Sequence, residues 1–143
     1  MEALLEVVIL PVSDADRSLL FYRAQVGFRL DVHYAPAPEF RVIQLTPEGS
    51  ATSIQFGVGL TEAAAGSVRG LYLVVADIER YRAELVGRGV EVGDVRHKDA
   101  AGGWRGGYLA GVDPDHGDYA SFADFYDPDG NAWVLQERNH PWA

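Results

Sequence analysis

Histidine and cysteine are the residue types that most often mark reactive or metal-binding sites, and this chain uses them sparingly. It contains no cysteine, which excludes disulfides, thiol nucleophiles and thiolate metal sites. Its histidines are His33, His97, His116 and His140. His33 lies in a strand-like stretch and is a candidate for acid–base catalysis, because histidine exchanges its proton near neutral pH. His140 belongs to a tail whose Trp142 we expect to pack on a partner subunit.

His97 and His116 fall in a glycine-rich segment, residues 96–119, that also contains Trp104 and Tyr108. The segment also contains Asp99, Asp113, Asp115 and Asp118. These side chains could bind a metal, but they lack the tight spacing of known metal sites. We therefore interpret the histidines and aspartates as polar residues of a loop. A long loop of this kind is typical of a lid over a pocket, and a solvated loop is the alternative.

The composition indicates a soluble globular protein. The chain has 143 residues, of which 48% are hydrophobic and 23% charged, so we expect one domain over residues 1–143. No apolar run reaches the roughly 20 residues of a membrane span, and the N-terminus lacks a basic signal-like start, which predicts a cytoplasmic protein. The net charge of -9 repels phosphate backbones and anionic membranes, so neither nucleic acid nor a membrane is an expected partner.

The hydrophobic pattern predicts one strand, one helix and three further strands in the first part of the chain. Residues 4–12 form an apolar, β-branched run that ends at Ser13, an expected N-cap, and the following helix should stop at Gly27. Alternation and turn residues then predict strands at 28–34, 40–45 and 52–57.

The same pattern returns in the second part of the chain. Residues 71–77 match 8–14, with Asp77 following Asp14 by 63 residues. Near the end, residues 134–136 match 53–55 at an offset of 81, so the second copy carries about 18 extra residues (81 minus 63). The repeat predicts two modules, 4–60 and 68–138, with the insert at 96–119.

The repeated motifs resemble those of the vicinal oxygen chelate superfamily, which contains glyoxalase I, extradiol dioxygenases and bleomycin resistance proteins. The resemblance rests on the order and spacing of these motifs: residues 10–14 with Arg17, 21–22 and 27–28, then 75–77, 87–90 and 127–131. It implies an α+β fold in which two tandem βαβββ modules form a curved mixed sheet around a cavity, and a homodimer.

The resemblance also implies that catalytic members hold a divalent metal through His, Glu or Gln on the first and last strand of each module. The matching positions here are Val7, Ser53, Gly70 and Val134. Valine and glycine side chains cannot ligate a metal, and one serine hydroxyl is too poor a ligand alone. We therefore expect no metal and no other cofactor at these positions. Metal ligands displaced from them are the alternative, and a one-residue slip would bring in Glu6.

Alternation along the strands predicts which side chains line the implied cavity, because residues two apart share a face. The predicted ligand-binding residues are Val7, Ile9, Ser53, Gln55, Gly70, Tyr72, Val134 and Gln136, with Trp104 from the insert. Gln55 and Gln136 should be equivalent in the two modules. Trp133 and Leu135 on the other face should pack on a helix, and Glu137 should be solvated.

An apolar pocket with two amides, a phenol and a hydroxyl suits a neutral or weakly polar organic ligand. The alternative is that these polar groups pair with one another in a closed core. We therefore expect a bleomycin resistance-like protein that binds or sequesters a small organic molecule. The alternative is a glyoxalase-like lyase or isomerase, or a dioxygenase, with displaced metal ligands or with His33 and Tyr72 as metal-free acid–base groups.

Overall fold

The computed structural model describes residues 1–139, apart from the side chains of residues 102–104. The chain divides into two compact units. The first unit comprises Met1–Val68 with the turn Asp127–Asn131, and the second comprises Arg69–Tyr126 with the residues from Ala132 onward. No helix in the described part of the chain is long and apolar enough to span a membrane.

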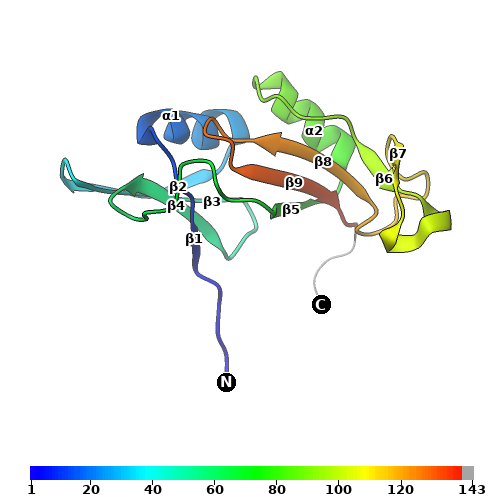
Figure 1. Cartoon of the computed structure of the whole chain (residues 1–143), viewed down its shortest axis with the longest axis horizontal. Helices are drawn as coiled ribbons and strands as arrows, with labels where there is room; N and C mark the ends of the chain where they lie inside the picture. The colour runs from blue at the N-terminus through cyan, green and yellow to red at the C-terminus, as the bar shows by residue number, and fades with distance from the viewer. Residues whose placement is uncertain (140–143) are drawn as a thin grey trace. The chain divides into compact units, whose positions relative to one another are not determined.

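The first unit is a four-stranded mixed sheet with one helix on one face (Figure 1). Its elements are β1 (Val7–Ile9), α1 (Ala15–Leu20), the π-helical segment η1 (Phe21–Val26), β2 (Arg29–Ala37), β3 (Phe40–Thr46) and β4 (Ser53–Val58). The strand order is β1-β4-β3-β2, and only β1 and β4 run parallel.

Both ends of the first helical segment follow from local chemistry. The carboxylate of Asp14 accepts hydrogen bonds from the backbone N–H groups of Asp16 and Arg17, so Asp14 is the N-cap and the prediction of Ser13 is wrong. Gly27 ends η1 with φ of 92°, a left-handed conformation that glycine adopts without a Cβ clash.

The second unit is a five-stranded mixed sheet, also with one helix on one face (Figure 1). Its elements are β5 (Leu71–Val75), α2 (Ile78–Gly87), β6 (Arg96–Lys98), the 3-10 helix η2 (Ala100–Arg105), β7 (Tyr108–Ala110), β8 (Ser121–Tyr126) and β9 (Ala132–Glu137). The strand order is β5-β9-β8-β6-β7, with β5 and β9 parallel. Asp77 caps α2 as Asp14 caps α1, which agrees with the repeat.

The second unit departs from the predicted pattern in two places. The strand expected after α2 is reduced to a single bridge between Val92 and Phe125. Residues 96–119, interpreted as a loop, instead contain β6, η2 and β7, and β6 extends the sheet by pairing with β8. The insert therefore supplies sheet structure.

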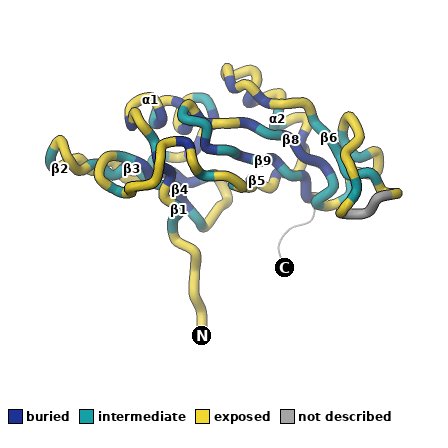
Figure 2. The backbone as a smooth tube through the Cα atoms, in the orientation of Figure 1, coloured by how far each residue is buried: buried dark blue, intermediate teal, exposed yellow. Residues whose placement is uncertain are grey.

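Each sheet packs one face on its helix. In the first unit the ring centroid of the buried Tyr22 lies 5.6 Å from that of Phe56 and 5.9 Å from that of Phe28. In the second unit the rings of Phe125 and Trp133 stack at 5.8 Å. Burial is concentrated along these strands, whereas the N-terminal residues before β1 are exposed (Figure 2). Within residues 1–139, neither α1 nor α2 covers the opposite face of its sheet, and we call these the first open face and the second open face.

Candidate functional site

The first open face carries one continuous row of side chains across all four strands. Strand register places Ile9, Gln55, Gln44 and Val32 side by side. The Gln55 Nε2 donates to the Gln44 Oε1 at 2.7 Å, which orients both amides. Ile9 remains 39% exposed, so the row offers apolar contact surface beside fixed polar groups.

A second row on this face starts at Val7, which pairs with Ser53. The Ser53 hydroxyl is buried and lies 2.6 Å from the Thr46 Oγ1, which in turn donates to the carboxylate of Asp31. This hydrogen bond, with a further one from Arg29, lowers the pKa of Asp31. Ser53 is therefore part of an internal hydrogen-bond chain. Asp31, at a bulge in β2, was missed because simple alternation does not anticipate an extra residue.

A small pocket opens where β1 and β4 end. Its volume is about 230 Å³, and its lining includes Pro11, Ser13, Gly57 and Thr61. Sites that bury a drug-sized ligand usually measure about 300–1,000 Å³, so this pocket alone suits only part of such a molecule.

The second open face carries two rows that include the remaining predicted positions. Tyr72, Val134 and Asp124 form one row, and Val74, Gln136, Phe122 and Arg96 form the other. Tyr72 is 55% exposed and Val74 41%. The Gln136 Nε2 donates to the Tyr119 carbonyl at 3.2 Å. Gly70 precedes β5 with φ of 80°, and a Cβ there would meet no atom within 4 Å, so this position is open.

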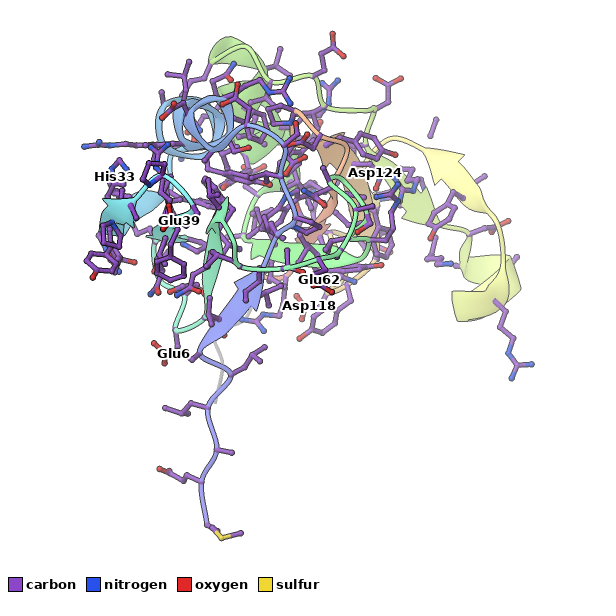
Figure 3. The ribbon with its side chains drawn as sticks, turned by 60° about the vertical axis from the view of Figure 1, so that its left-hand side comes forward. Glu6, His33, Glu39, Glu62, Asp118 and Asp124 are labelled. Carbon is purple, nitrogen blue, oxygen red and sulfur yellow. The ribbon has the colours of Figure 1, made fainter. Side chains whose placement is uncertain are left out.

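Cationic and aromatic side chains cluster on the β6–β7 part of the second open face. The Arg96 guanidinium forms two hydrogen bonds with the carboxylate of Asp124, labelled in Figure 3, at 3.0 and 3.1 Å. It also lies 4.8 Å from the ring centroid of Tyr108, and the Lys98 ammonium lies 4.3 Å from the same ring. The Tyr108 ring meets that of Phe122 edge-on. Sequence reasoning missed this cluster because it assigned the segment to a loop, where alternation does not apply.

His33 lies on the other side of its sheet from Gln55, because it pairs with Ile43 on the face that packs on the helix. Its Nε2 accepts from the Arg41 Nε at 3.1 Å, and the Arg41 guanidinium also pairs with Asp16 of α1 at 2.8 Å. Figure 3 shows His33 on β2 toward α1. The Arg41 guanidinium lowers the pKa of the Asp16 carboxyl. His33 thus belongs to an ion-pair cluster on the helix side, while the other catalytic candidate, Tyr72, lies on the second open face.

Glu137 is completely buried, so the prediction that it is solvated is wrong. Its Oε2 accepts from the backbone N–H of Ile78 at the start of α2, and its Oε1 lies 2.9 Å from the His116 Nδ1. The carboxylate raises the pKa of His116 through the hydrogen bond and its charge. Trp133 and Leu135, on the same face of β9, are buried as predicted.

Strand register also corrects the alignment of the two modules. Val8 pairs with Ile54, and its equivalent Leu71 pairs with Trp133, so the last strands are related by an offset of 79 rather than 81. The predicted equivalence of Gln55 and Gln136 is therefore wrong by two residues, and Gln55 corresponds to Val134. An even slip keeps every side chain on its predicted face.

The positions that the resemblance assigns to a metal do not fit one. Val7 and Ser53 are neighbours, and the corrected register replaces Val134 by Ala132 opposite Gly70. None except Ser53 has a ligating side chain, and the Ser53 hydroxyl is engaged by Thr46. Within residues 1–139, no three His, Asp or Glu side chains form a group that could hold a metal ion. Glu6 is exposed ahead of β1 (Figure 3). The side chain of Trp104 lies outside the described residues.

The amino-acid sequence matches the model of a known protein family. A family model described as the Glyoxalase/Bleomycin resistance protein/Dioxygenase superfamily matches residues 4–135. No curated protein matches the sequence significantly.

Three solved structures illustrate the likeness. TnmS3, an antibiotic binding protein from Streptomyces sp. CB03234, is 29% identical, with 95% of this chain and 96% of that chain covered and a TM-score of 0.70. A glyoxalase/bleomycin resistance protein from the same organism is 30% identical, with 92% and 97% covered and a TM-score of 0.66. A superfamily member from Sphaerobacter thermophilus DSM 20745 is 25% identical, with 96% and 98% covered and a TM-score of 0.71.

These likenesses confirm the α+β glyoxalase/bleomycin resistance-like fold that the family resemblance implied. The chain belongs to the Glyoxalase/Bleomycin resistance protein/Dioxygenase superfamily.

Proposed function

We propose that this chain is a small-molecule-binding protein that holds an organic ligand of antibiotic type on an open sheet face. The observation that carries the proposal is the composition of the open faces. The exposed Ile9 lies in register with Gln55, and the exposed Val74 lies in register with Gln136. The exposed Tyr72 lies in the row next to Val74 on the same face. Apolar surface with a few fixed polar groups is typical of sites that bind organic molecules. The likeness to TnmS3, described as an antibiotic binding protein, supports the same function.

The proposed binding does not use a metal at the positions occupied by Val7, Ser53, Gly70 and Val134. The ligand would be held by apolar burial, with the amides orienting its polar atoms. Turnover by the usual metal chemistry of the superfamily would need several oxygen or nitrogen ligands, and these positions supply only the Ser53 hydroxyl, which Thr46 engages. Sequestration is therefore the function that the residues support best.

A neutral fluorescent probe tests this proposal directly. N-phenyl-1-naphthylamine is apolar and brightens on leaving water, so we expect saturable binding to the native protein. Val74→Asp puts a charge on the second open face and should weaken that binding by about tenfold or more, because a buried unpaired carboxylate is costly. The matched control is Val86→Asp on α2, a valine of similar exposure, at 46% against 41%, outside the open faces.

Equal loss of probe binding in the two variants, or no saturable binding to the native protein, would show that the open face is not the site. Native mass spectrometry of protein purified from its own host provides a second measurement. It reports the number of subunits, any stoichiometric metal and any retained small molecule together. The homodimer implied by the family resemblance is part of this proposal, and a stoichiometric metal ion would contradict the metal-free mode of binding.

A further inference from the structure

Charge is unevenly distributed over the second open face. Lys98 and Tyr108 pair across β6 and β7, and Arg96 lies two residues before Lys98, so all three side chains share that face. The Lys98 ammonium and the Arg96 guanidinium lie 4.3 and 4.8 Å from the Tyr108 ring centroid. Tyr108 is nevertheless 48% exposed, so the cluster is accessible.

The two cations differ in how their charge is balanced. Arg96 forms a bidentate pair with Asp124, which neutralises its charge and fixes its position. The Lys98 side chain contacts the Tyr108 ring, and no ion pair joins it to a carboxylate within residues 1–139. The cluster therefore carries one positive charge that its own residues leave uncompensated.

This local excess contrasts with the rest of the molecule. The chain carries a net charge of -9, and on the first open face the charge of Asp31 is balanced by Arg29. Because the protein as a whole is negatively charged, Lys98 attracts an anion only at short range. This favours a ligand whose apolar part binds the face first. Tyr108 supplies exposed aromatic surface for that part, and the buried Phe122 supports its ring in edge contact at 5.7 Å.

We infer that the ligand is an aromatic acid, that is, a ring system bearing a carboxylate, sulfonate or ionised phenol. This inference rests on the proposed function and defines the ligand class of the same site. The anionic group pairs with Lys98, and the ring system packs on the exposed part of Tyr108, which the buried Phe122 supports from beneath. Arg96, held by Asp124, keeps the Tyr108 ring in place.

Two probes with the same ring skeleton separate this inference from the proposed function. 8-Anilinonaphthalene-1-sulfonate carries a sulfonate that N-phenyl-1-naphthylamine lacks. We expect the native protein to bind the sulfonate probe more tightly. Lys98→Met keeps an unbranched side chain that is one atom shorter and removes the charge. It should weaken sulfonate binding by about five- to tenfold while changing neutral-probe binding less than about twofold.

Lys98→Arg should restore the preference for the sulfonate, because it retains the charge. Arg80→Met on α2 has the same effect on net charge at an exposed ion pair and should leave both affinities unchanged. If the neutral probe binds and Lys98→Met does not alter sulfonate binding, the aromatic-acid inference is overturned and the proposed function stands. If neither probe binds saturably, both are overturned.

A site-resolved measurement on the native sequence covers the case in which a variant misfolds. Lys98 is the only lysine in the chain, so reductive methylation with 13C-formaldehyde labels only Lys98 and the α-amino group. The methyl groups keep the charge. We expect the Lys98 methyl resonance to shift on titration with the sulfonate probe, and an unmoved resonance at saturation would overturn the inference.

Discussion

Glu137 illustrates how a single residue on the packed face of a strand can hold the start of a helix. Its buried carboxylate accepts from the first backbone N–H of α2 and from the ring of His116. An anion at a helix N-terminus is favoured by the helix dipole and by the unpaired N–H groups there. These two bonds explain why a charged residue is tolerated with no exposure at the end of β9.

Two substitutions of Glu137 should separate the contribution of its side-chain volume to stability from that of its hydrogen bonds. Glu137→Leu fills similar space but leaves the N–H of Ile78 without this acceptor, and we expect it to lower the free energy of unfolding by about 3 kcal/mol. Glu137→Gln keeps an acceptor and should cost about 1 kcal/mol. Urea denaturation measures both values. Equal losses would show that charge, rather than the acceptor, is what Glu137 contributes.

The side of the sheet on which each residue lies could be predicted from the sequence, and its partners could not. Val7, Ile9, Ser53 and Gln55 share the first open face because alternation is a property of the strand backbone itself. That Gln55 bonds to Gln44 depends on strand order, which the pattern of one strand does not contain. For the same reason Lys98 and Tyr108 were not recognised as neighbours.

The helices show which local signals can be predicted reliably at the level of elements. Asp14 and Asp77 occupy matching positions in the repeat and both cap a helix. The choice between Ser13 and Asp14 was wrong because both residue types cap well, and the Ser13 hydroxyl is instead engaged by Asp129 of a turn distant in sequence. The long-range contact between Ser13 and Asp129 thus leaves Asp14 as the N-cap of α1.

Removing the cap of α1 should cost about 1 kcal/mol. Asp14→Ala removes the acceptor of two backbone N–H groups, whereas Asp14→Asn keeps it, so the asparagine variant should lose only a few tenths of a kcal/mol. Chemical denaturation followed by far-UV circular dichroism compares the two. An alanine variant as stable as the native protein would indicate that Ser13 takes over as cap.

In the second module the strand expected after α2 is interrupted, and the chain from Val92 to Lys98 follows one edge of β8 with an irregular stretch between. Residues 96–98 pair with β8, while the stretch around Val92 keeps one bridge. The repeat predicted a strand after the second helix, whereas residues 96–119 were interpreted as a loop, so the continuation of pairing to residues 96–98 was not predicted. Predicting the outcome required knowing that Arg96 would lie opposite Phe122 and reach Asp124.

At the scale of the whole molecule, the compact units do not coincide with the sequence repeat. The turn Asp127–Asn131 comes from the second copy, yet it belongs to the first unit. There the Asp127 carboxylate accepts from the buried hydroxyl of Tyr22 at 2.9 Å, and Asp129 accepts from Ser13 and Arg17. The repeat predicted this turn but not the unit on which it packs, because that packing depends on contacts between residues more than 100 positions apart along the chain.

Asn131 is the residue of this turn on which we expect the first unit to depend most. Its side chain is completely buried, donates to the Pro11 carbonyl at 3.0 Å and to Asp127 at 2.7 Å, and accepts from the N–H of Val68 at 3.1 Å. Asn131→Ala removes all three bonds and should lower the free energy of unfolding by about 3 kcal/mol. Hydrogen exchange should accelerate at Gly66, whose amide bonds to the same Pro11 carbonyl.

The matched control is Asn139→Ala, because Asn139 is the only other asparagine in the chain and is exposed. Its loss should change stability by less than about 0.5 kcal/mol. If Asn131→Ala changed the free energy of unfolding as little as Asn139→Ala does, the turn would not contribute to the stability of the first unit. A large loss confined to Asn131 would mean that the first unit is completed only after the chain has passed through most of the second, so its folding requires the nearly full-length sequence.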